Sequence, residues 1–392
     1  MEGMPRLPRI VIDDVRPRTP APDRPAKAVV GEHVRVSADI FKDGHDVLGA
    51  RVRWRPVDKP AWGEAPLQAL ENDRWEGVIE PTTLGAHELV IEAWTDLWAT
   101  WHHKATVKAD AGQEIDLELE EGALLLERRA KAVDGPDRER LRQTATRLRD
   151  GQLAAALEPE VAVLMEGPLD TKDVTQSRPY PLWVDRERAL VGAWYELFPR
   201  SYGGLRGTAE RVPAVARMGF DVLYLPPIHP IGTTFRKGRN NTLDPTPDDP
   251  GSPWAIGSPD GGHTAIAPEL GTFEDFDDLV RVANDNGLEI ALDYALQCSP
   301  DHPWVSEHPE WFHKRPDGSI AYAENPPKKY QDIYPINFWP AKEKDRVALW
   351  EACRDVLFFW IGHGVRIFRV DNPHTKPTAF WAWVLPQVQQ EH

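Results

Sequence analysis

The chain has 392 residues and a formal net charge of −16 at pH 7, so it is long enough for about two or three domains, and nucleic acid and anionic membranes are poor candidates as partners. Its two cysteines, Cys298 and Cys353, are too few for a disulfide framework, and we see neither a signal peptide nor an apolar run long enough to cross a bilayer. We therefore expect a cytoplasmic protein.

The first part of the chain is predicted to be a β-sandwich that follows a tail. Residues 1–25 are rich in Pro and Arg and are expected to be poorly ordered. Residues 26–112 contain short runs in which polar and apolar residues alternate, separated by Gly, Asp and Pro, as in residues 87–94. This period of two is typical of antiparallel strands. The sandwich itself carries no catalytic motif.

A helical segment is predicted next, over residues 113–175. Its composition is dominated by Ala, Leu, Glu and Arg at helical spacing, and the dipeptides Gly135-Pro136 and Glu158-Pro159 divide it into shorter helices. Amphipathic helices beside a sandwich more often form a packing or dimerisation surface than an active site.

Residues 176–392 follow a different rhythm, in which strands alternate with helices. This order indicates parallel βα units. The predicted helix 272–286 begins with Thr272 and Asp275 at capping-box spacing and ends at Gly287. Residues 296–343 are too long for a simple connector and are expected to form a loop subdomain. The expected strands are residues 193–198, 222–225, 288–293 and 365–371.

The last of these strands ends in the residue that we consider most informative. Asp371 follows a buried run, and Asn372-Pro373 then turns the chain into a loop. Arg369 lies two residues earlier on the same face of the strand, where it keeps Asp371 ionised, as a carboxylate nucleophile requires. A purely structural alternative remains, in which Asp371 caps the following helix and Arg369 pairs with it.

Four motifs follow one another in residues 194–201, 219–228, 292–293 and 369–372. In their order and spacing they resemble the α-amylase superfamily, family 13 of the glycoside hydrolases. Four further segments, residues 235–241, 297–304, 324–332 and 371–377, carry a closer resemblance. They are similar to the bacterial maltose-1-phosphate maltosyltransferases, which extend α-1,4-glucan from a phosphorylated donor.

The resemblance implies a (β/α)8-type barrel of which about the first four βα units are present, and a hexosyltransferase activity. It assigns Asp371 as the nucleophile, Arg369 as the arginine that holds it ionised and Asp293 as a residue that shapes the site. No cofactor is implied. Since Gln297-Cys298 replaces the Asn-His pair of ordinary amylases, we expect no metal site. The residues that would line the donor's sugar and phosphate are Lys237, Gln297, Asn325, Lys328, Tyr330, Asp332 and Asn372.

The distribution of charge independently favours a phosphorylated donor. In an acidic chain, positive residues gather in two loops expected at the barrel mouth, although two solvated surface loops would have the same composition. These residues are Arg236, Lys237 and Arg239 in one loop, and Lys328 and Lys329 in the other.

By resemblance, Asp371 would attack the anomeric carbon of α-maltose 1-phosphate, expel phosphate and form a covalent maltosyl intermediate. A base would then activate the non-reducing end of an α-1,4-glucan acceptor. In this family the base is a glutamate on the fifth strand, and the chain stops at His392 before it. We therefore expect a truncated form of the enzyme that is inactive alone. The family resemblance also implies a homodimer.

Two other interpretations remain open. The chain could be an α-glucan hydrolase or a trehalose-forming isomerase of the same superfamily, which would act on free maltose or starch without phosphate. It could also be a non-catalytic fragment that binds glycan or dimerises through the sandwich and helices.

Overall fold

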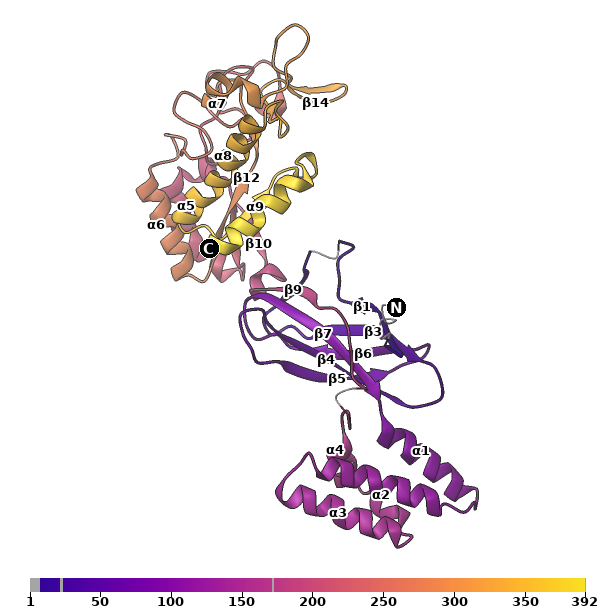
Figure 1. Cartoon of the computed structure of the whole chain (residues 1–392). Coiled ribbons are helices and arrows are strands. Elements are labelled where there is room, and N and C mark those ends of the chain that lie inside the picture. The colour runs from indigo at the N-terminus through magenta and orange to yellow at the C-terminus, as the bar shows by residue number, and fades with distance from the viewer. Residues whose placement is uncertain (1–7, 22–23, 171–172, 392) are drawn as a thin grey trace. The chain divides into compact units, whose positions relative to one another are not determined.

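The computed structural model describes residues 8–21, 24–170 and 173–391. The chain divides into two compact units, residues 1–191 and 192–392, and each is described separately (Figure 1). Residues 1–7 and 22–23 of the predicted tail therefore lie outside the described part. Within that part, no helix has the length and apolar character that crossing a membrane requires.

The first unit is built on a strongly curled sheet. Its neighbouring strands follow the order β1-β3-β6-β5-β4-β7-β9-β2, and all pair antiparallel except β2 with β9. Strand β5 pairs with both β4 and β6, so the two halves of the sheet close over one core that contains Val36, Val52 and Ile91. The strands are β1 (Ile10–Arg16), β2 (Ala26–Val29), β3 (Val34–Lys42), β4 (Leu48–Pro56), β5 (Gly63–Ala69), β6 (Arg74–Ile79), β7 (Gly85–Thr95), β8 (Thr175–Gln176) and β9 (Tyr180–Asp185).

The sandwich extends beyond the predicted limits at both ends. Strand β1 lies inside the segment that we expected to be a tail, because Ile10 and Val15 are apolar and become buried against β3. Strand β9 lies inside the segment assigned to the barrel, but it pairs with β7 and β2 and buries Leu182 and Val184 in the sandwich. The change to βα architecture therefore comes after residue 191.

The helical region of the first unit begins earlier than residue 113. Helix α1 (Leu97–Asp110) starts directly after β7, where the Asp96 side chain accepts a hydrogen bond from the Ala99 N–H. Its Trp101 packs against α2 (Asp116–Ala130), at Gly122, where an added Cβ would lie 2.2 Å from the indole ring. Helices α3 (Gly135–Arg149) and α4 (Pro159–Met165) complete the cluster, and both begin at the predicted Pro positions.

The second unit contains a parallel four-stranded sheet in the order β10-β11-β12-β17. A helix follows each strand in the chain, as in a (β/α)8 barrel, and the sheet fits part of such a barrel (Figure 1). The predicted βα alternation is therefore confirmed. The strands are β10 (Trp194–Glu196), β11 (Val222–Leu225), β12 (Glu289–Tyr294) and β17 (Ile367–Val370), and the helices are α5 (Leu205–Arg217), α6 (Phe273–Asp285), α8 (Glu343–Gly362) and α9 (Thr378–Glu391).

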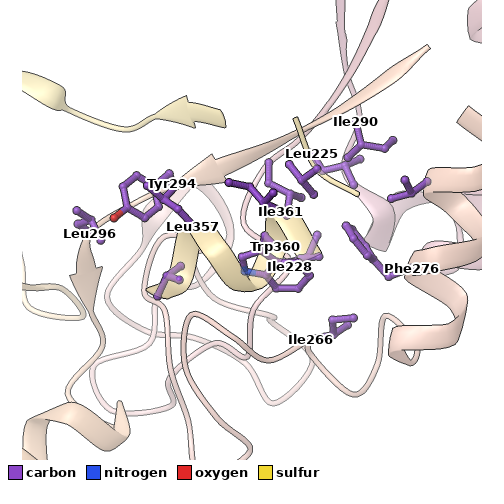
Figure 2. Close-up of a cluster of buried hydrophobic side chains, with 14 of the residues drawn as sticks. Leu225, Ile228, Ile266, Phe276, Ile290, Tyr294, Leu296, Leu357, Trp360 and Ile361 are labelled. Atoms are coloured by element: carbon purple, nitrogen blue, oxygen red, sulfur yellow. The ribbon is translucent and has the colours of Figure 1, made fainter. Parts of the chain in front are cut away.

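The core of the second unit lies between the helices and one face of this sheet. Figure 2 shows Leu225 and Ile290 from the strands near Phe276 of α6 and Trp360 of α8, and all four are buried in one cluster. Because side chains alternate along a strand, the opposite face carries a different set of residues. That face holds Tyr224 and, further along, the acidic and basic residues of the site.

Two long connections follow β11 and β12 and carry most of the remaining short elements. The connection after β12 corresponds to the predicted loop subdomain 296–343, in which β13 (Gln297–Cys298) pairs with β16 (Tyr334–Pro335) and β14 (Ala323–Asn325) pairs with β15 (Lys328–Tyr330). The same connection contains the short helix α7 (Pro303–Glu307).

Candidate active site

The candidate nucleophile is held by a hydrogen bond at each of its polar groups. Asp371 directly follows β17 and is 9% exposed. Its N–H donates to the Tyr294 carbonyl at 3.3 Å, and its own carbonyl accepts from Lys376 Nζ at 3.1 Å. Its Oδ1 accepts from Arg369 Nη1 at 2.7 Å, and its Oδ2 accepts from Asn372 Nδ2 at 3.1 Å. The carboxylate therefore has a fixed orientation.

Arg369 joins this carboxylate to a second one on the neighbouring strand. The strand register places Arg369 directly beside Asp293, and the same Nη1 donates to Asp293 Oδ2 at 2.9 Å. Asp293 Oδ2 also accepts from the Tyr224 hydroxyl and from Trp254 Nε1. These three donors stabilise a carboxylate that is only 4% exposed. Burial nevertheless raises the pKa of Asp293 above its ordinary value.

Asp371 opens into a cavity of about 820 Å³, a size typical of a small-molecule site. Asp332 also lines the cavity and is buried. Burial raises the pKa of its carboxyl group, and the positive charge of Lys237 acts in the opposite direction. Asp332 Oδ1 has no hydrogen-bond partner among the described residues. The predicted residues that line the cavity are Gln297, Asn325, Tyr330, Asp332, Asp371 and Asn372.

The other predicted residues lie outside the cavity wall. Arg369 contacts the carboxylates of both Asp293 and Asp371, as described above. Lys237 is 5% exposed and close enough to Asp332 for its charge to act on that carboxyl group. Lys328 is exposed on β15, opposite Asn325 of β14.

The structure corrects one part of the charge argument. Arg236 donates to the backbone carbonyls of Gly232, Ile231 and Asp249, and Arg239 forms an ion pair with Asp249 at 3.5 Å. The Arg236 guanidinium is therefore engaged with backbone carbonyls of its own loop. Arg239 pairs with a carboxylate of the same connection, and its side chain stays 87% exposed. Of the first basic loop, Lys237 is the residue whose charge acts on the cavity wall.

Sequence reasoning missed three residues of the site. Tyr224 and Trp254 both bind Asp293, and Lys376 binds the Asp371 backbone. Tyr224 had a detectable signal, since it stands near the end of a predicted strand. Trp254 stands in a long connection without a pattern, and tertiary folding alone brings it to β12.

His263, Cys298 and His302 form a buried group whose potential ligand atoms lie within 4.8 Å of one another. The hydrogen bonds satisfy the imidazoles without an ion. The Trp304 N–H donates to His302 Nδ1, so the proton of His302 is on Nε2 and is donated to His263 Nδ1 at 3.0 Å. His263 Nε2–H then donates to the Ala295 carbonyl. A metal on His302 Nε2 would displace this proton, so the residues do not fit a metal centre.

Comparisons with known proteins place the chain among its relatives. Residues 8–186 match the sequence profile of domain N/S of alpha-1,4-glucan:maltose-1-phosphate maltosyltransferase. The chain is 55% identical to alpha-1,4-glucan:maltose-1-phosphate maltosyltransferase 1 of Streptomyces coelicolor, over 97% of this chain and 58% of that protein. Over almost its whole length the chain is homologous to part of this maltosyltransferase.

A second maltosyltransferase, from Myxococcus xanthus, is 48% identical over 99% of this chain and 61% of its own length. The chain thus spans about three-fifths of the length of these maltosyltransferases. Among solved structures, a crystal structure of an alpha-amylase from Lactobacillus plantarum aligns with 51% of this chain and 43% of its own, with 29% sequence identity and a TM-score of 0.44.

Proposed function

We propose that this chain carries the donor half of a retaining glycosyltransferase site, which takes maltosyl units from α-maltose 1-phosphate for transfer to the non-reducing end of α-1,4-glucan. The observation that carries the proposal is the Asp371 carboxylate, fixed by Arg369 and Asn372 at the wall of a cavity of about 820 Å³. The names of the related maltosyltransferases supply the donor and the acceptor.

In the first step an oxygen of Asp371 attacks the anomeric carbon of the donor. The bond between that carbon and the phosphate oxygen breaks, and its electron pair leaves with inorganic phosphate. The product is a β-maltosyl ester of Asp371. Phosphate is a good leaving group, so this step needs little help from a general acid. Arg369 Nη1 lies 2.7 Å from Asp371 Oδ1 and orients this carboxylate for the attack.

The second step transfers maltose to the acceptor and needs a base on the other side of the sugar. Asp293 is bound by Arg369 on the same side as Asp371, and three donors already engage its Oδ2. We assign the proton-transfer role neither to Asp293 nor to the other described carboxylates. We therefore propose that this chain by itself forms the maltosyl ester of Asp371 and completes the transfer to an acceptor only slowly.

Sugar and phosphate are recognised by different parts of the site. The unpartnered, buried Asp332 Oδ1 is an acceptor suited to a sugar hydroxyl, and Gln297 and Tyr330 add polar groups to the same wall. Lys237 and the exposed Lys328 supply the charges for phosphate. Asn325 lies on the hairpin that carries Lys328 and positions that hairpin against the cavity.

Covalent trapping tests the proposal. A 2-deoxy-2-fluoro-α-maltosyl fluoride carries a good leaving group and forms an ester that hydrolyses slowly. We expect intact-mass spectrometry to show one added fluoromaltosyl group, located on Asp371 by peptide mapping, and no label on Asp371→Asn. Asp317→Asn, which removes an exposed carboxylate from the loop connection, serves as the matched control and should label normally. Labelling of another residue, or no labelling, would contradict the assignment.

We also propose that the chain forms a homodimer through the helices of the first unit. Leu117 and Leu124 stand seven residues apart on α2, so they share one face, and both are more than half exposed. Val107 of α1 is also exposed. Sedimentation velocity should give a dimer for the chain and a monomer for Leu117→Glu/Leu124→Glu, and a monomeric parent chain would refute the proposal.

A further inference from the structure

Lys376 is a buried cation beside the candidate nucleophile that the proposed chemistry does not use. It follows the loop after β17, is 8% exposed, and lines the same cavity as Asp371. Its Nζ donates to the Asp371 carbonyl at 3.1 Å and to Thr375 Oγ1 at 3.0 Å. The contact depends on Asn372, whose φ of 45° reverses the chain so that the short helical turn Pro373–Thr375 brings Lys376 back to Asp371.

The charges around Lys376 explain why a lysine lies there. Asp293 and Asp371 supply two buried negative charges, and Arg369 supplies one positive charge. The Lys376 ammonium makes the sum of the cluster zero. Burial lowers the pKa of Lys376, and attraction by Asp371 and Asp293 acts in the opposite direction. Cys353 of α8 is another titratable neighbour, and burial raises the pKa of its thiol and so keeps it neutral.

Each contact of Asp371 holds a different part of that residue. Arg369 and Asn372 hold the carboxylate of Asp371, and the Tyr294 carbonyl holds its N–H. Lys376 is the residue that binds the Asp371 carbonyl, and hence the start of the loop. Without it a buried carbonyl would lose its donor, and the cluster would carry an unbalanced negative charge.

We propose that Lys376 is a positioning residue for Asp371: its ammonium fixes the Asp371 carbonyl and balances the two buried carboxylates, so that the Asp371 side chain is held toward the cavity. The proposal rests on the proposed function insofar as Asp371 is the nucleophile. The electrostatic link between Lys376 and Asp371 follows from the geometry alone and does not depend on the proposed reaction.

A double-mutant cycle tests that link without any catalysis. Lys376→Met and Asp371→Asn are made singly and together in the full chain, and the Tm of the transition that they shift is followed by calorimetry at pH 7. We expect Lys376→Met to lower the Tm less when Asp371 is already Asn, because one of the two negative charges that the lysine balances has gone. Equal shifts in the two backgrounds would overturn the proposal. If Lys376→Met does not fold, Lys376→Gln takes its place.

Labelling by 2-deoxy-2-fluoro-α-maltosyl fluoride provides the second readout. We expect Lys376→Met to slow the labelling of Asp371 by more than about tenfold, or about 1.4 kcal/mol in activation free energy, and Lys376→Arg to restore part of the rate. The control is Lys344→Met, which removes an exposed lysine of α8.

The two readouts separate the proposals. Coupling in the cycle together with no labelling of the parent chain would refute the nucleophile assignment and support the electrostatic role of Lys376. Labelling of the parent chain without coupling in the cycle would refute the role of Lys376 alone. Failure of Lys376→Arg to recover any labelling, in a protein of unchanged Tm, would also count against the positioning role.

Discussion

At the residue scale, the site is organised by one guanidinium that binds two carboxylates. Arg369 Nη1 contacts Asp293 and Asp371 at once, so neither carboxylate can move without changing the environment of the other. The sequence predicted the pairing of Arg369 with Asp371, which share a strand face, and a place for Asp293 in the site. It did not predict the contact between Arg369 and Asp293. The two further donors to Asp293, Tyr224 and Trp254, could not be predicted, since those contacts depend on how the strands align and on where a long connection packs.

Tyr224→Phe tests the support that Asp293 receives. The substitution removes the hydroxyl that donates to Asp293 Oδ2 and keeps the ring in place. Hydrogen bonds to charged groups contribute about 1.5–3 kcal/mol, so we expect an unfolding free energy lower by about that amount and slower labelling of Asp371.

Urea unfolding and the labelling rate measure the two effects of this change. Tyr195→Phe is the matched control, since Tyr195 is a neighbour on β10 that packs against Phe220 through its ring. Equal behaviour of the two variants would show that the Tyr224 hydroxyl does not support Asp293.

Lys237→Met tests how the phosphate is recognised. Lys237 is buried near Asp332, and its removal takes away a positive charge while the apolar stem is kept. We expect the affinity for α-maltose 1-phosphate to fall about tenfold, or about 1.4 kcal/mol, and the affinity for maltose to stay nearly constant. Isothermal titration calorimetry measures both. A parallel loss for the two ligands would indicate that Lys237 supports the fold of the loop instead.

At the element scale, sequence patterns located the second unit better than the first. Thr272 begins α6 with both hydrogen bonds of the predicted capping box present, and β12 and β17 end next to the predicted aspartates. Helix α1 was missed because its Leu-Trp-Ala-Thr-Trp start follows a strand directly and has almost no amphipathic pattern. Strand β1 was missed because the surrounding Pro and Arg residues concealed a short apolar run.

Thr272→Ala removes the cap of α6. The Thr272 hydroxyl accepts from the Asp275 N–H, and the loss of such a cap costs about 1 kcal/mol. We expect the urea-unfolding free energy of the second unit to fall by that amount. Thr146→Ala makes the same chemical change at an exposed position within α3, where Ala is a better helix former, and should not destabilise the protein. A loss equal to that of Thr272→Ala would rule out capping as the cause.

The buried imidazoles of His229 and His302, in the two long connections, should make the fold sensitive to acid. Burial lowers the pKa of His229 to about 4 and that of His302 to about 3, whereas an unfolded histidine titrates near 6.5. Between pH 6.5 and about 4 the unfolded chain therefore binds protons that the folded chain does not. Stability present above pH 6.5 should be lost as the pH falls through this range.

The Tm measured across this pH range checks the expectation. The fall should be shallower in His302→Asn, in which one titrating group is replaced by a residue that can also cap α7. His45→Asn, at an exposed position of the first unit, should follow the parent chain. A pH dependence identical in all three proteins would exclude the buried imidazoles as its source.

At the scale of the whole molecule, the two units have separate cores. Val36 and Leu126 belong to clusters within residues 1–191, and Phe276 belongs to a cluster within residues 192–392. The sequence indicated this division through its change of rhythm but placed the boundary too early. Strand β9 alternates buried and partly buried residues, and its pairing with β7 and β2 identifies the unit to which it belongs.

Phe276→Ala should destabilise one unit selectively. Phe276 is fully buried beside Trp360, and truncation of such a residue costs about 3–5 kcal/mol. We expect calorimetry to show a lower Tm for one transition and an unchanged Tm for the other, and Leu126→Ala should give the reverse pattern. A shift of both transitions by either variant would show that the units unfold cooperatively.

The cavity also contains its own optical probe. The Trp254 indole forms part of the wall, and its N–H is bound to the buried Asp293 carboxylate, so the polarity around the ring depends on what lies next to it. A sugar phosphate that enters should change the fluorescence emission of the protein, and Trp254→Phe should abolish the change. Occupancy of the site can therefore be followed by spectroscopy, even if no bond is ever broken there.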